Sequence, residues 1–187
     1  GATVDAPFNV TFTDDATWRG LIDSVYVGGV KLTAGYAVSS GQITFTPSAS
    51  APASALETLG SKGIVVYATG YAAATVTQAI GVGADNKLFV TTQPVGPVNN
   101  GGLLATQPVV VIQDQYGNTT ASTASITAAV GSGSFTIGGT LSKTAVAGSA
   151  TFTDLTATSS TSVTGVQINF TSGSLTAVLS SGFNIGA

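Results

Sequence analysis

The ionisable side chains set narrow limits on the chemistry open to this chain of 187 residues. The sequence contains 8 acidic and 5 basic residues, and it contains no His, Cys or Met. Without His, the usual general base near neutral pH and the commonest transition-metal ligand are both missing. Without Cys, disulfides and thiolate metal sites are excluded. A hydroxyl nucleophile would therefore lack its usual activating base.

The carboxylates offer little further catalytic chemistry. Paired carboxylates can hydrolyse a glycoside, but Glu57 is the one Glu and the Asp residues lie mostly in predicted turns. The sequence also contains no Ser-x-x-Lys motif. We therefore expect the chain not to be an enzyme.

Calcium is the metal that the remaining oxygen ligands could bind, since Ca²⁺ takes about six to eight oxygens. Three short clusters are candidates: Asp14 with Asp15, Asp85 with Asn86, and Asp114 with Asn118. The alternatives are a helix cap, a linker turn and a β-turn held by Asx hydrogen bonds. No EF-hand spacing supports calcium. Asp85 and Asn86 form the best candidate, because an ion in a linker would stiffen it. No cofactor other than Ca²⁺ is predicted.

Charge and hydropathy exclude two classes of partner. The formal net charge is −3, and the basic residues are scattered along the chain, so neutralisation of nucleic-acid phosphates is not expected. No apolar run approaches the roughly 20 residues that would span a bilayer, so membrane insertion is not expected. No signal peptide is visible, and Gly1 as first residue suggests a fragment of a longer protein.

The elements that must position these residues are short strands. Charged residues make up only 7 % of the chain, and the β-branched Thr and Val that replace them favour strands over helices. In the first half, residues 8–12 and 42–46 alternate apolar and polar side chains. Gly28 and Gly29 predict a two-residue hairpin turn. Trp18, Leu21 and Ile22 have the spacing of one face of a short helix, which predicts Trp18 as a core residue rather than a sugar-stacking platform.

The second half has a more regular rhythm of strands and turns. Eight short segments between residues 88 and 185 alternate with Gly-containing turns, which is typical of a β-sandwich. The Gly/Asp/Asn-rich stretch at residues 81–86 marks the boundary. The prediction is an all-β chain of two consecutive Ig-like β-sandwich domains, residues 1–86 and 87–187, the first with one or two short helical turns.

Residues 6–82 resemble the hemoglobin-interacting type of domain found in repeats of Gram-positive surface proteins, including S-layer proteins. The resemblance is carried by Phe8-x-x-x-Phe12, Asp14-x-x-x-Trp18, Ile22-x-x-Val25-x-Val27-x-Gly29, Ile43-x-Phe45, Val66-x-Ala68-x-Gly70-Tyr71 and Val76-x-Gln78-x-Ile80. It implies haem or hemoglobin capture in some relatives. Haem iron is held by His, Met, Cys or Tyr. Only Tyr is present, and Tyr67 and Tyr71 are predicted as core or turn aromatics, so haem binding is not predicted here.

Residues 87–187 resemble a bacterial Ig-like module of the invasin or filamin type. The resemblance is carried by Leu88-Phe-Val-Thr-Thr-Gln-Pro94, Val109-Val-Val-Ile-Gln-Asp-Gln-Tyr-Gly-Asn118 and Gly148-x-Ala150-Thr-Phe152-x-x-Leu155. It implies tandem modules that form rods, lattices or spacers on the bacterial surface.

Three hypotheses for function follow from these resemblances. The first is a structural module of an extracellular S-layer or cell-wall array, whose partners are neighbouring copies or domains of the same surface protein. The second is an adhesin module that binds a host protein or a glycan. The third is an accessory domain of a secreted polysaccharide-degrading enzyme.

Overall fold

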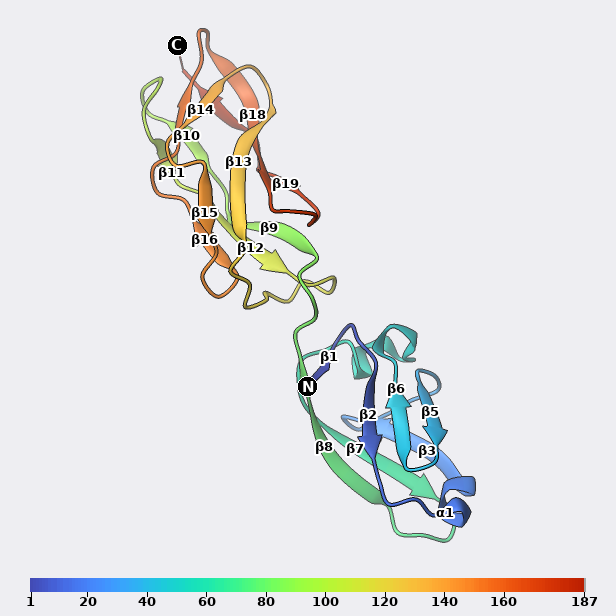
Figure 1. Cartoon of the computed structure of the whole chain (residues 1–187). Helices are drawn as coiled ribbons and strands as arrows, with labels where there is room; N and C mark the ends of the chain where they lie inside the picture. Colours follow the sequence, from blue (N-terminus) through green and yellow to red (C-terminus); the bar gives the residue numbers. More distant parts are fainter. Residues whose placement is uncertain (187) are drawn as a thin grey trace. The chain divides into compact units, whose positions relative to one another are not determined.

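The computed structural model describes residues 1–186, and the chain divides into two compact units. The N-terminal unit is Gly1–Gly83 and the C-terminal unit is Ala84–Ala187 (Figure 1). The division falls between Gly83 and Ala84, within the Gly/Asp/Asn-rich stretch at residues 81–86. The backbone of Asn86 belongs to the second unit, because its N–H donates to the carbonyl of Gln113 at 2.9 Å and its carbonyl accepts from Thr176 N at 3.0 Å.

The N-terminal unit contains two β-sheets, and Figure 1 shows the smaller one in front of the larger. The larger sheet has the order β1 (Ala2–Thr3), β8 (Ala74–Gly81), β7 (Gly60–Ala68), β3 (Ile22–Val27) and β4 (Val30–Lys31). The smaller sheet has the order β2 (Phe8–Thr11), β6 (Gln42–Phe45) and β5 (Tyr36–Ser39). The predicted hairpin between β3 and β4 is confirmed, since Gly28 and Gly29 have φ angles of 59° and 81°.

Alternating side chains build the core between these sheets. Val25 and Val27 on β3, Ile64 on β7, and Ile43 and Phe45 on β6 are at most 2 % exposed. The residues between them on each strand face outward, which is the two-residue period of a strand with one buried face. The core therefore lies between the central strands of the two sheets.

Helical structure in this unit is limited to α1 (Ala16–Gly20) and two 3₁₀ turns, η1 (Pro47–Ala49) and η2 (Ala53–Ala55). The predicted helical face of Trp18, Leu21 and Ile22 is wrong. Leu21 is the C-cap of α1 and is 41 % exposed, and Ile22 already begins β3. The helix ends early because Ile22 already pairs with Ala68 of β7 as the first residue of β3.

The C-terminal unit is also built from sheets. One has the order β16 (Ser149–Thr151), β12 (Val109–Gln113) and β9 (Lys87–Thr92). Another has the order β15 (Ser142–Thr144), β13 (Ser125–Ser132), β18 (Val163–Thr171) and β19 (Val178–Leu179), and β20 (Phe183–Ile185) also pairs with β18. Two small ribbons pair β10 (Val95–Pro97) with β11 (Leu104–Thr106), and β14 (Thr136–Gly138) with β17 (Thr156–Thr158).

A single buried cluster fills this unit. Phe152 and Phe170 are fully buried and their ring centroids lie 5.5 Å apart. The strands β10, β11 and β17 lie outside the predicted segments, because strands of three residues are too short to show a two-residue period. The last of the eight predicted segments, residues 174–185, was expected as one closing strand but contains two strands, β19 and β20.

The all-β prediction is confirmed, and both units have the layered architecture expected of Ig-like modules. Within residues 1–186, no helix has the length and apolar character that crossing a membrane requires.

Candidate functional site

The N-terminal sandwich is open along one side, where β2 and β8 face each other. β2 is the edge of the smaller sheet, and β1 pairs with β8 only at Ile80 and Gly81. Val76 on β8 lies opposite the buried Ile64 of β7 in the pairing register, yet it is 44 % exposed. The core-facing side of this edge is therefore only partly covered.

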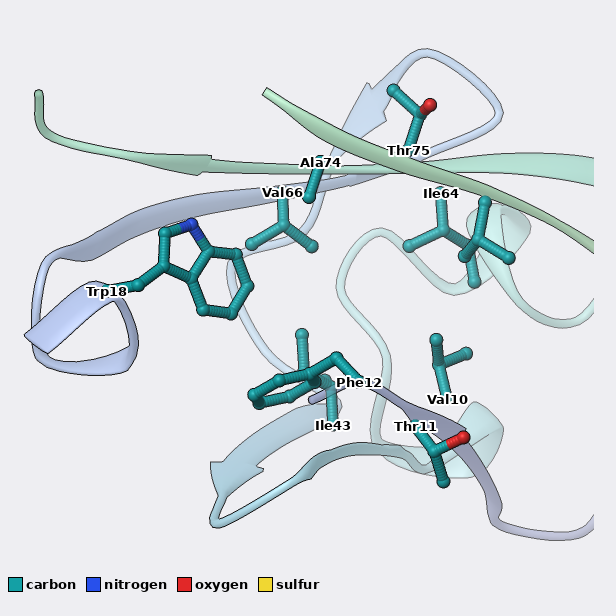
Figure 2. Close-up of a pocket in the computed structure, with 10 residues that line it drawn as sticks. Val10, Thr11, Phe12, Trp18, Ile43, Ile64, Val66, Ala74 and Thr75 are labelled. Carbon is teal, nitrogen blue, oxygen red and sulfur yellow. The ribbon is translucent and has the colours of Figure 1, made fainter. Parts of the chain in front are cut away.

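A cavity of about 120 Å³ lies between these edges. Figure 2 shows side chains from both sheets directed into it. Its lining is Val10, Thr11, Phe12, Trp18, Ile43, Ile64, Val66, Ala74, Thr75 and Val76. None of these side chains is ionisable, so the cavity favours apolar ligand groups.

An aromatic mouth adjoins this cavity. A more open hollow of about 260 Å³ is lined by Phe12, Thr13, Asp15, Trp18, Tyr71 and Ala74, three of which also line the cavity. Phe12 and Trp18 meet edge to face, with ring centroids 5.1 Å apart and an interplanar angle of 67°. We call the cavity and its mouth together the aromatic groove.

The acidic residues at the start of α1 hold Trp18 in this position. Asp15 is the N-cap, and its carboxylate accepts from Thr17 N at 2.8 Å and from Trp18 N at 3.0 Å. Asp14 forms an ion pair with Arg19 and accepts from Ser40 Oγ at 2.7 Å. These contacts tie α1 to the loop between β5 and β6.

The same contacts perturb the titration of Asp14. Hydrogen bonds from Arg19 and Ser40 stabilise its ionised form and lower its pKa from 3.8 to about 2. Asp14 is therefore a carboxylate under all but strongly acidic conditions, and its role at the groove is to position α1.

Two predictions about aromatic residues need correction. Trp18 is only partly buried and lines the groove, whereas a core residue was predicted. Tyr71 lies at the turn after β7, as one of the two predicted alternatives, and its N–H donates to the carbonyl of Ala68 at 3.1 Å; Tyr67 is neither a core nor a turn residue, because it lies on β7 and is 44 % exposed. Tyr71 lines the mouth of the groove, while Tyr67 packs against Tyr26 on β3 at a centroid distance of 5.5 Å. The alternation of buried and exposed side chains along β7 explains why Tyr67 is exposed, because it lies on the outward face between the buried Val66 and Ala68.

Of the calcium candidates, Asp14 and Asp15 lie in the N-terminal unit, whereas Asp85, Asn86 and Asp114 lie in the C-terminal unit, where the N–H of Asn86 donates to the carbonyl of Gln113, the residue before Asp114. Asp14 and Asp15 are engaged at α1, as predicted for a helix cap, and Asp85 and Asn86 are exposed where the second unit begins. No group of three His, Cys, Asp or Glu residues suited to a metal occurs within residues 1–186. Calcium binding at these positions stays a prediction.

Asp114 is fully buried in the C-terminal unit. Its carboxylate accepts from Tyr116 N at 3.0 Å, from Asn118 N at 2.9 Å and from Asn118 Nδ2 at 2.9 Å. These bonds close the turn between residues 114 and 118, which is the Asx-type role that was the alternative to calcium.

Comparisons with solved structures agree with this fold. The D00-D0 domain of intimin has 12 % sequence identity and a TM-score of 0.50, with 100 % of this chain and 95 % of that chain covered. Domains 4 and 5 of the S-layer protein SbsC have 17 % identity and a TM-score of 0.37, with 88 % and 100 % covered.

A Parabacteroides merdae β-glucuronidase has 12 % identity and a TM-score of 0.37, with 88 % of this chain matched. The match spans only 21 % of that enzyme's length. At 12 % identity, the similarity to the intimin domain shows the fold alone. No curated protein matches this chain in sequence.

A family model matches residues 1–81, and its description is "Heme-binding protein Shr-like, Hb-interacting domain". Haem itself does not fit the groove. Of the residue types that ligate haem iron, Tyr alone occurs in the chain, and Tyr71 is the one that lines the groove. The lining also contains no Lys or Arg that could pair with the haem propionates, and the carboxylate of Asp15 would repel them. Over residues 1–81, the chain is thus similar to the Hb-interacting domain of Shr-like heme-binding proteins, with a groove that does not suit haem.

Proposed function

We propose that this chain is a protein-binding module of an extracellular bacterial surface protein. In this proposal the N-terminal unit binds the partner, and the C-terminal unit is an Ig-like spacer that acts through its shape. The role is associative rather than enzymatic. The observation that carries the proposal is the aromatic groove, where Phe12, Trp18 and Tyr71 present partly exposed rings beside an uncharged cavity.

The physics of protein interfaces supports this assignment. Trp and Tyr are enriched among the residues that dominate binding energy, because they bury a large area and lose little conformational entropy. The match of residues 1–81 to an Hb-interacting domain makes hemoglobin the first partner to test. A protein surface can present an apolar side chain to the groove, whereas haem alone does not fit it.

The test is a titration of the immobilised whole chain with hemoglobin. Trp18→Ala and Tyr71→Ala should each weaken binding by about tenfold or more, since truncation of an aromatic hot spot costs upward of roughly 2 kcal/mol. Tyr67→Ala is the matched control, because Tyr67 is 44 % exposed against 46 % for Tyr71 but lies outside the groove. It should change the dissociation constant by less than about twofold.

The proposal fails if Tyr67→Ala weakens binding as much as the two groove variants do. Absence of hemoglobin binding by the wild-type chain at concentrations near 100 μM would remove hemoglobin as the partner.

Self-association into an S-layer or cell-wall array is the second candidate. It is favoured by the composition, because only 7 % of residues are charged and copies can pack closely without strong repulsion. Sedimentation of the chain over a wide concentration range, with and without Ca²⁺, tests it. A monomer at every concentration, combined with hemoglobin binding, would decide for the adhesive role.

A further inference from the structure

The outer edge of β8 has unpaired backbone hydrogen-bonding groups beside the aromatic groove. Val4 N donates to the carbonyl of Gly81 at 3.1 Å, so the backbone of Gly81 faces β1. Backbone groups of a strand alternate between its two sides, so Ala79, Thr77 and Thr75 face the same way as Gly81. Among residues 1–186, no strand pairs with β8 on this side before Ile80.

This edge carries none of the features that usually protect an exposed strand. Proteins guard sheet edges with charges, Pro, bulges or very short strands. β8 has eight residues, Ala-Thr-Val-Thr-Gln-Ala-Ile-Gly, without a charge or a Pro. By contrast, the edge strand β4 at the other side of this sheet has two residues and includes Lys31.

Two local contacts show how this edge is completed. At its end, β1 adds to it as a parallel strand, with Ala2 opposite Ile80 and Thr3 opposite Gly81. One residue before, the carbonyl of Ala79 accepts from the side-chain Nε2 of Gln78 at 2.8 Å, in place of a partner backbone. The last two residues of β8 thus already pair with an added strand, β1.

The groove beside the edge sets the side-chain chemistry of the added strand. Thr75 and Val76 of β8 line the cavity together with Val10 and Phe12, so a strand laid on this edge would direct side chains toward it. The cavity of about 120 Å³ is close to the roughly 150 Å³ that accommodates a benzene-sized group in another protein. It has room for one bulky apolar side chain and no group to pair with a charge.

We propose that the outer edge of β8 and the aromatic groove bind an extended, uncharged peptide segment of a partner protein. The segment pairs with Thr75 and Thr77 as an added strand and places one bulky apolar side chain in the cavity. This inference rests on the protein-binding function proposed above and specifies the form of the partner. Backbone pairing supplies affinity, and the cavity supplies selectivity.

The probe is a capped octapeptide that alternates Thr with Val or Ile, with a terminal Lys at each end for solubility. Two control peptides accompany it, one with Asp at the central Ile and one with N-methylated backbone amides on its pairing side. Binding is followed by NMR titration and amide hydrogen exchange of the whole chain. The probe should protect the amides of Thr75 and Thr77, and each control peptide should bind at least about tenfold more weakly, because it loses backbone pairing or buries a charge.

Thr77→Pro and Thr77→Val form a matched pair of protein variants. Pro removes the outward N–H and is tolerated on an edge strand, whereas Val keeps the N–H. Thr77→Pro should weaken probe binding about tenfold or more, and Thr77→Val should change it less than about twofold. If Thr77→Pro unfolds the unit, the N-methylated peptide tests the same backbone pairing on the wild-type chain.

Equal binding by both variants, protection that excludes β8, or no binding of the probe at millimolar concentration would overturn the inference. Hemoglobin binding distinguishes failure of the strand-addition inference from failure of the proposed protein-binding function. If hemoglobin binds Thr77→Pro as tightly as the wild type, strand addition is wrong while the protein-binding function stands. If hemoglobin does not bind the wild type, the peptide titration alone decides the role of the edge.

Discussion

The two units complete their cores in different ways. In the C-terminal unit, Phe152 and Phe170 are both 0 % exposed and pack within one closed cluster. In the N-terminal unit, Phe12 and Trp18 also pack ring against ring, but both remain partly exposed at the open side of the sandwich. Similar strands, rich in Thr and Val, thus produce one unit whose aromatic pair stabilises it and one whose aromatic pair is available to a partner.

The two units also differ in how far their Asp carboxylates are buried. Asp114 is buried and closes a turn of the C-terminal unit, while Asp15 caps a short helix in solvent. We therefore expect a carboxylate to contribute more to the stability of the C-terminal unit than to that of the N-terminal unit.

The largest effect is expected for Phe152→Ala. Removal of a fully buried ring leaves a cavity and should lower the stability of the C-terminal unit by about 3–5 kcal/mol. Phe12→Ala is the matched change in the N-terminal unit and should cost less than about half of that, because its ring is already partly solvated. Urea unfolding of the whole chain, with each unit followed by its own NMR signals, provides the measurement. Equal costs would remove the distinction between a closed and an open core.

The next effect is expected for Asp114→Ala. The substitution leaves the N–H groups of Tyr116 and Asn118 without this acceptor and should cost about 2–3 kcal/mol. Asp15→Ala removes an exposed N-cap and should cost about 1 kcal/mol in the N-terminal unit. Thermal unfolding of both variants checks the order, and a greater loss for Asp15→Ala would contradict it.

A smaller effect on stability is expected for Trp18→Ala, about 1–2 kcal/mol, because the indole is only partly buried. Its loss of partner binding should be large by comparison. Trp18→Phe keeps an aromatic ring against Phe12 and should retain most of the stability. A stability loss for Trp18→Ala as large as that for Phe152→Ala would show that Trp18 is structural.

The smallest effect concerns pH and Asp14. Its folded pKa is about 2 against 3.8 for the unperturbed group, so ionisation of Asp14 stabilises the folded unit above pH 3.8. That stabilisation is lost as the pH falls from about 4 to about 2. The melting temperature of Asp14→Asn should therefore lie slightly below that of the wild type at pH 7, and the two should converge near pH 2. A difference that persists at pH 2 would show that another property of the carboxylate is involved.

Some features of the site were predictable because they depend on a few consecutive residues. Asp15 was predicted to cap a helix and does so, since an N-cap needs only a side chain and the next two or three N–H groups. The turn at residues 114–118 was predicted for the same reason. The groove was not predicted, because its lining comes from β2, α1, β6, β7 and β8, which are far apart in sequence. A Trp with Tyr and Phe nearby gives no local sign of whether another strand covers it.

The sequence by itself determined that the chain is all-β, where the Gly28–Gly29 hairpin turns, and which chemistry is missing, because residue types and short-range periods act locally. Only the tertiary structure decided that Trp18 and Tyr71 reach a groove, that Asp114 is buried, and that β8 keeps a free edge. Exposure and pairing depend on which distant strands meet, and a one-residue change in register reverses the face that a side chain takes. The exposure of the aromatic residues and the free edge of β8 were therefore decided by the packing of the sheets.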